Sequence, residues 1–184
     1  KTATEEILKN KNNAWVVLGR DRPGARTSGY GGRGDSQAAA IDIVVGRMGA
    51  DVIEYDNGGQ AIWVNPDFQK DAARIYISQK TDVDANFNSN RKPPSSTKII
   101  PRSAIALKAD GIRLIAREGI KLVTRTDATN SQGGTVQGIQ GIDIIAGNDD
   151  KDLQPMVKGD NLQQALERLT HHMDSLNGIV NSLL

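Results

Sequence analysis

Hydrophobic residues recur with the most regular spacing at the C-terminal end of the chain. Asp160 is a favourable N-cap, and Gln163 follows three residues later as in a capping box. Steps of four and three residues then separate seven apolar positions: Leu162, Leu166, Leu169, Met173, Leu176, Val180 and Leu183. This a/d pattern predicts a coiled-coil helix over residues 159–184, whose apolar seam faces a partner. An amphipathic helix that packs on its own domain is the alternative.

A second pattern, a pair of apolar residues separated by one residue, recurs ahead of this helix. The pairs are Ile105 and Leu107, Ile112 and Leu114, and Ile120 and Leu122; Gly141-Ile142-Asp143-Ile144 has the same form. Strands of only three or four residues cannot hold a sheet alone, but they can stack in layers. The repeat therefore predicts a β-helix or an intertwined triangular prism with the apolar pairs inward. An ordinary antiparallel meander is the alternative.

The first half of the chain alternates in the manner of β-strands. Asn57-Gly58-Gly59 is a strong hairpin-turn sequence. Ahead of the strands, Thr4 and the two acidic residues after it predict a short helix within residues 1–12. The predicted strands are residues 14–18, 41–45, 52–55, 61–64 and 73–77.

Together these elements predict a mainly β protein: a short-strand β domain with a prism-like or β-helix-like repeat, followed by a C-terminal coiled-coil helix. The Gly-rich stretch 19–37 cannot form a packed core, and the polar loop 86–97 is a plausible boundary. The predicted regions are an N-terminal arm and Gly-rich loop (1–37), a β domain (38–97), a prism-like repeat (98–158) and the helix (159–184).

The composition favours burial between copies of the chain. Aromatic residues make up only 4 % of the 184 residues, so few large side chains can fill a single core. The net charge of +1 disfavours a nucleic-acid-binding protein. No apolar stretch approaches the ~20 residues of a membrane span, so no membrane insertion is expected. The polar start, residues 1–12, does not read as a signal peptide, and we expect synthesis in the cytoplasm.

Candidate motifs for chemistry are weak. Gly29-Tyr30-Gly31-Gly32-Arg33-Gly34 fits G-x-G-x-x-G, but a β-like stretch follows it where a nucleotide site needs a helix. Arg33-Gly34-Asp35 reproduces the integrin tripeptide, and we interpret it as loop sequence. The absence of Cys excludes disulfides, Cys-ligated zinc and thiol nucleophiles.

The titratable residues form no recognisable catalytic or metal-binding set. His171 and His172 are neighbours on the predicted helix and point about 100° apart, so one chain cannot join them on a metal ion. Asp82, Asp84 and the acidic residues of 148–152 lack acid/base or calcium-loop spacing. We therefore expect no enzyme activity, no catalytic residues, no cofactor and no metal.

With these residues in view, the chain resembles structural proteins of tailed bacteriophages. The run from Ser103 to Thr124 looks like the stacked β-prism of baseplate central-spike and related contractile-injection proteins. The ending from Met156 through the heptads is similar to helical trailers of myophage virion proteins, and residues 40–48 and 71–84 also look like segments of such proteins. The chain has no His-x-His tip motif, which disfavours a membrane-puncturing apex.

The resemblance implies a homotrimer that assembles in the host bacterial cytoplasm and contacts neighbouring virion proteins. The expected role is a spike, fibre-like or adaptor component of the tail or baseplate. Capsid decoration, a neck or head-fibre role and receptor binding are the alternatives. The expected interface residues are the six of the first three repeat pairs, Ile105, Leu107, Ile112, Leu114, Ile120 and Leu122, with the seven seam residues of the helix.

Overall fold

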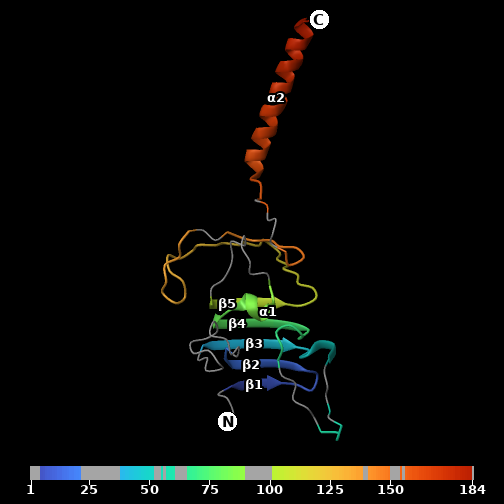
Figure 1. Cartoon of the computed structure of the whole chain (residues 1–184), viewed down its shortest axis with the longest axis vertical. Coiled ribbons are helices and arrows are strands. Elements are labelled where there is room, and N and C mark those ends of the chain that lie inside the picture. Colours follow the sequence, from blue (N-terminus) through green and yellow to red (C-terminus); the bar gives the residue numbers. More distant parts are fainter. Residues whose placement is uncertain are drawn as a thin grey trace. The chain divides into compact units, whose positions relative to one another are not determined.

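The computed structural model describes residues 5–21, 38–51, 55, 57–60, 66–89, 101–138, 141–149, 154 and 156–183. The chain divides into two compact units, Lys1–Lys151 and Asp152–Leu184. The first unit holds an antiparallel sheet and a long extended segment, and the second holds one helix (Figure 1). Each unit is described by itself.

The sheet is a five-stranded meander in which every strand pairs antiparallel with its neighbour in the sequence (Figure 1). Its strands are β1 (Glu6–Lys9), β2 (Ala14–Arg20), β3 (Ala39–Val45), β4 (Ala73–Thr81) and β5 (Arg102–Lys108). The predicted strands at 14–18, 41–45 and 73–77 are confirmed as parts of β2, β3 and β4. Apolar alternation was therefore a sound guide in this part of the chain.

The predicted N-terminal helix is wrong, because residues 6–9 form strand β1. The Asn-rich stretch after it forms the turn of a β1–β2 hairpin. The Asn10 Oδ1 accepts hydrogen bonds from the backbone N–H groups of Asn12 (3.0 Å) and Ala14 (3.1 Å), and Asn13 is left-handed with φ 58°. Asn tolerates that conformation and favours such turns. Pairing with the apolar β2 thus overrides a weak helix signal.

The first repeat pair belongs to the meander. Ile105 and Leu107 lie in β5, opposite Ile77 and Ile75 of β4. The later pairs, from Ile112 to Ile144, lie in no strand of the described chain. Residues 102–108 therefore form part of an antiparallel meander, which was the alternative prediction. Residues 109–138 and 141–149 contain no named strand.

One sheet unites strands from three of the predicted regions. β1 and β2 come from residues 1–37, β3 and β4 from 38–97, and β5 from 98–158. The boundary between the two compact units falls after Lys151. The mainly β architecture with a C-terminal helix is as predicted.

The described chain also contains a 3-10 turn, η1 (Gly49–Asp51), and two helices, α1 (Val83–Phe87) and α2 (Gly159–Leu183). The Asp82 side chain caps α1 by accepting from the backbone N–H of Ala85. α2 begins at Gly159, so Asp160 lies in its first turn and not at the N-cap. The Gln163 side-chain amide donates to Glu167 at 2.9 Å. In a capping box it would instead accept from the backbone N–H of the N-cap residue.

Several sequence predictions fall outside the described residues. These are the Gly-rich loop with its G-x-G-x-x-G and Arg-Gly-Asp motifs, the strand at 61–64 and most of the strand at 52–55. Asn57 and Gly58 lie in a turn, as predicted.

Candidate assembly surfaces

The seam of α2 is open along its whole length. All seven predicted seam residues lie within the helix, and each side chain is exposed, from 47 % at Leu162 to 80 % at Leu183. Ile179 is a further exposed apolar residue beside this seam. Apolar side chains at this spacing form a continuous stripe on one side of a helix. The stripe is suited to burial against other helices.

The positions that flank the seam carry no permanent charge. With Leu166 as position a, the e positions hold Gln163, Thr170 and Asn177, and the g positions hold Ala165, His172 and Ile179. The helix's charged residues lie farther from the seam at positions b and c: Asp160, Glu167, Arg168 and Asp174. The uncharged band is therefore wider than the a/d stripe.

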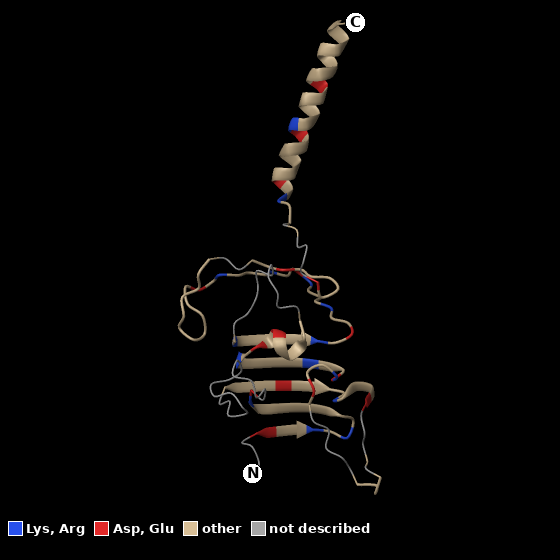
Figure 2. Cartoon of the chain, in the orientation of Figure 1, with Lys and Arg blue, Asp and Glu red and all other residues tan. Residues whose placement is uncertain are grey.

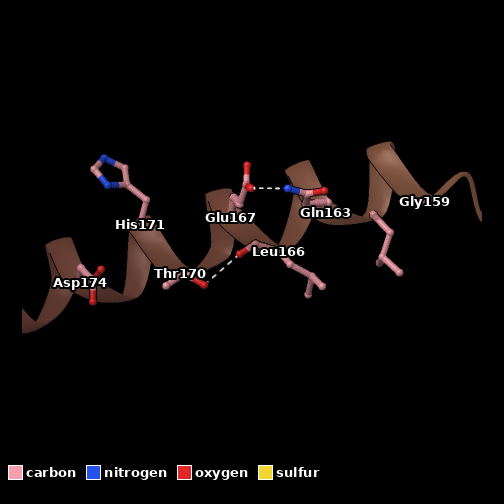
Figure 3. Close-up of a pocket in the computed structure, with 8 residues that line it drawn as sticks. Gly159, Gln163, Leu166, Glu167, Thr170, His171 and Asp174 are labelled. Carbon is pink, nitrogen blue, oxygen red and sulfur yellow. Dashed lines mark hydrogen bonds between the residues drawn. The ribbon is translucent and has the colours of Figure 1, made fainter.

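A shallow hollow runs along one side of α2, and Figure 3 shows its lining. All of its lining residues belong to α2 itself, among them Leu162, Leu166 and Thr170. The Thr170 hydroxyl donates to the Leu166 carbonyl at 3.0 Å. Glu167 and His171 project away from the side on which Leu166 lies. The hollow is thus an open part of the surface of α2.

The segment after β5 is the second open surface. Every residue from Ala109 to Val123 is exposed, including Ile112, Leu114, Ile120 and Leu122. Ile142 and Ile144 are exposed as well. The one bridge within residues 109–138 joins Thr129 and Thr135, so residues 111–123 pair with no described strand. Extended backbone of this kind has N–H and C=O groups available for another chain.

The third surface is one face of the sheet, here called the open sheet face. Two rows of opposed side chains cross all five strands, since each residue stands beside its registered partner on the next strand. The first row begins with Glu6 on β1, and the second begins with Leu8. The apolar members after β1 are Leu18, Ile41, Ile77 and Ile105 in the first row, and Val16, Ile43, Ile75 and Leu107 in the second.

The open sheet face is exposed even at its centre. Ile41, Ile43, Ile75 and Ile77 retain 36–38 % of their surface, and the β5 members retain more, with Ile105 at 70 %. A central strand normally places such β-branched side chains in a core. Here the face that carries them is the exposed one, and Figure 2 shows few charged positions along the strands.

The opposite face of the sheet is covered and contains charged groups. Trp15, Val17, Ala40, Val44 and Tyr76 are buried on it. The rings of Phe68, from the loop before β4, and Phe87, from α1, pack against Tyr76 and against each other. The single acidic position of β3, seen as the red band in Figure 2, is Asp42, which is buried here.

Arg74 is the centre of this covered face. Its Nε and Nη2 donate to the two carboxylate oxygens of Asp42 at 2.8 and 3.0 Å, and Nη2 also lies 3.1 Å from Asp71 Oδ2. Its guanidinium lies 4.3 Å from the centre of the Phe68 ring. Asp71 also accepts from the backbone N–H groups of Met48 and Asp67, which fixes the loops at both ends of the β3–β4 connection. This network is structural: it joins two neighbouring strands to their loops.

Burial shifts the ionisation of two groups on this face. Burial raises the pKa of Asp42 above its usual value, although the nearby Arg74 guanidinium opposes the shift. Burial, together with the hydrogen bond that its hydroxyl donates to Asp21, raises the pKa of Tyr76. Both shifts have a packing explanation, and the cavity beside these residues is small, about 50 Å³. That volume has room for water molecules.

The described residues contain no cluster of three or more His, Cys, Asp and Glu side chains able to hold a metal ion. In that same part of the chain, no helix combines the length and apolar character that crossing a membrane requires. His171 and His172 lie side by side on exposed α2, and Asp82 is used in capping α1.

The structure leaves all thirteen predicted interface residues exposed, and it brings two of them into a larger surface. Ile105 and Leu107 share the open sheet face with Ile41, Ile43, Ile75 and Ile77, which the sequence analysis did not assign to an interface. A signal existed, because Asp42 and Arg74 alternate with these isoleucines and so had to lie on the other face. Searches of protein-family models, curated proteins and solved structures found no match to this chain.

Proposed function

We propose that this chain is a non-enzymatic structural protein that works as a parallel homotrimer, as a spike, fibre-like or adaptor component of a phage tail or baseplate. The observation that supports it best is the uninterrupted seam of α2, whose seven apolar residues are all exposed. The virion role rests on the resemblance of residues 103–124 and 156–183 to phage structural proteins.

The helix needs partners for energetic reasons. Most of the stability of a protein helix comes from packing of its apolar face, and α2 has Gly178 inside it at a cost of about 1 kcal/mol. Burying a Leu, Met or Val side chain contributes roughly 1.5–3 kcal/mol. Seven such residues per chain stabilise a bundle far beyond what the helix achieves alone.

The extended segment supports the same assembly. Its apolar pairs recur along the chain, and residues 111–123 pair with no described strand. In an intertwined prism, the neighbouring copies supply the missing ladder partners, and the pairs Ile112 and Leu114, and Ile120 and Leu122, point to the common axis. A prism has three sides, which is why we propose three copies.

The residues beside the seam of α2, at heptad positions e and g, also favour three helices. Positions e and g become buried as helices are added to a bundle, and charges there commonly select pairs of helices. On α2 these positions hold uncharged residues, with Ala165 and Ile179 among them, and His172 is their one titratable group. A bundle of three parallel helices buries such flanks without leaving a permanent charge unpaired.

Hydrogen exchange provides a direct test. We expect the backbone amides of residues 111–123 to exchange slowly in the assembled protein, because partner chains accept their hydrogen bonds. The control is the Leu169→Asp variant under the same conditions, in which the same amides should exchange rapidly. Rapid exchange of residues 111–123 in the unsubstituted protein would contradict the proposed prism.

A further inference from the structure

We infer that the open sheet face is a further interface between copies of this chain, so that the sheet is also part of the trimer. The inference rests on the proposed homotrimer and extends it to the sheet of the N-terminal unit, where no interface residue ahead of Ile105 was predicted. Its evidence is the geometry, charge and area of the face.

The geometry is that of a sheet that packs on another sheet. At about 4.8 Å between strands, a row across five strands is roughly 19 Å long. The two rows contain apolar residues at every position except Glu6, at the edge strand β1. Flat apolar surfaces of this kind are found on the inner sides of two packed sheets, about 10 Å apart.

The lack of charge at the centre of the face limits which partners can cover it. The rows contain no charged residue inside the β1 edge, whereas Asp42 and Arg74 lie on the covered face. The charged residues on this face, Glu6 and Arg20, lie at its edges, so its centre offers a nucleic acid or a charged peptide no complementary group. Copies of the same face that turn toward one threefold axis complement one another, because apolar rows meet apolar rows and the centre of the face leaves no charge buried.

The area is sufficient for a specific contact. The exposed large side chains of the face are Leu8, Leu18, Ile41, Ile43, Val45, Ile75, Ile77, Ile105 and Leu107. Together they expose on the order of 700 Å², near the 800 Å² that each partner contributes to a standard interface. A patch of this size is larger than monomers usually leave in water.

The chain itself connects this face to the proposed prism. β5 ends at Lys108, and the pair Ile112 and Leu114 follows in the extended segment four residues later. The pair Ile105 and Leu107 on β5 belongs both to the open sheet face and to the repeat. The copies that assemble through the repeat are therefore the copies available to cover the sheet.

Single-cysteine variants of the full chain test the inference, because the native chain contains no Cys. The test variant is Ile43→Cys at the centre of the face, and the accessible control is Ser175→Cys on the outer side of α2. We expect maleimide to label Ile43→Cys at a rate at least about tenfold lower than that of Ser175→Cys, since buried thiols are inert. We also expect a short bismaleimide to join two Ile43→Cys chains.

A third variant, Leu169→Cys, separates this inference from the proposed function. If Leu169→Cys cross-links between chains while Ile43→Cys labels as fast as Ser175→Cys, the homotrimer stands and the sheet interface is overturned. Slow labelling of Ile43→Cys without any cross-link also overturns it, because the cover is then not another copy. If both variants label rapidly and neither cross-links, the proposed homotrimer fails as well.

Discussion

Leu169→Asp will dissociate the assembled protein into single chains at micromolar concentration. Leu169 is a central d position of the α2 seam, and symmetry would place three carboxylates in one apolar layer of the bundle. An unpaired buried charge costs several kcal/mol, in addition to the leucine contacts that are lost. Sedimentation velocity or light scattering should show the mass fall from three chains to one.

Ser175→Asp is the matched control, because it adds the same charge to the same helix at an outward position. We expect this variant to keep the assembled mass and the helix content of the native protein. If Leu169→Asp keeps the same mass as Ser175→Asp, the seam does not hold the copies together, and the helix packs in some other way.

Arg74→Met will destabilise the sheet unit more than any surface substitution. The Arg74 side chain is only 1 % exposed, and its removal leaves Asp42 and Asp71 buried without their main counter-charge. Breaking a buried pair in this way costs about 3–5 kcal/mol. At roughly 2–4 °C per kcal/mol for a chain of this size, the melting temperature should fall by about 10 °C.

Acidification should reduce the loss of unfolding free energy that Arg74→Met causes. Because its folded-state pKa is raised, Asp42 contributes stability that is present below its ordinary pKa and is lost as pH rises through the raised value. Arg74→Met removes the attraction that opposes the rise, so the pKa of Asp42 should rise further. We expect chemical denaturation to show a smaller loss at pH 5 than at pH 8.

Lys70→Met is the matched control for Arg74→Met, because Lys70 forms an exposed ion pair with Asp51 at 3.1 Å. Exposed pairs contribute about 0–1 kcal/mol, so this variant should melt close to the native protein. Equal melting temperatures for Arg74→Met and Lys70→Met would show that the buried network is not the structural centre of the sheet.

The sequence predicted the strands where apolar residues alternate over at least two periods. β3 and β4 were found in this way, and the long helix from its own period, whereas β2 was found as a short continuous apolar run. The N-terminal strand β1 was missed, since its four residues are too short for a period and gain stability only by pairing with β2. Tertiary pairing of this kind leaves little trace in local sequence.

The exposed apolar surfaces were predicted in part. The seam of α2 and the exposed repeat pairs followed from spacing alone. The open sheet face did not, because alternation shows which residues share a face but not which face is covered. The covered face is the one on which Phe68 and Phe87 pack together and Arg74 pairs with Asp42. The members of these pairs lie far apart in the sequence, so local alternation does not reveal which face they cover.

The resulting sheet has its charges inside and its isoleucines outside, which makes physical sense for a subunit. Asp42 and Arg74 pair with each other under the cover of Phe68, so the main charges of that face are already buried and neutralised within the chain. The isoleucine side has no comparable cover among the described residues and is suited to burial by association. On this account, one chain contains only part of its own hydrophobic core.

The most direct test of this account is the solution mass of the full chain, measured by light scattering over a range of concentrations. We expect a mass of three chains, since α2, the extended segment and the open sheet face all need partners. The mass should stay at this value on dilution through the micromolar range. A single-chain mass at every concentration would contradict the proposed homotrimer and the sheet interface together.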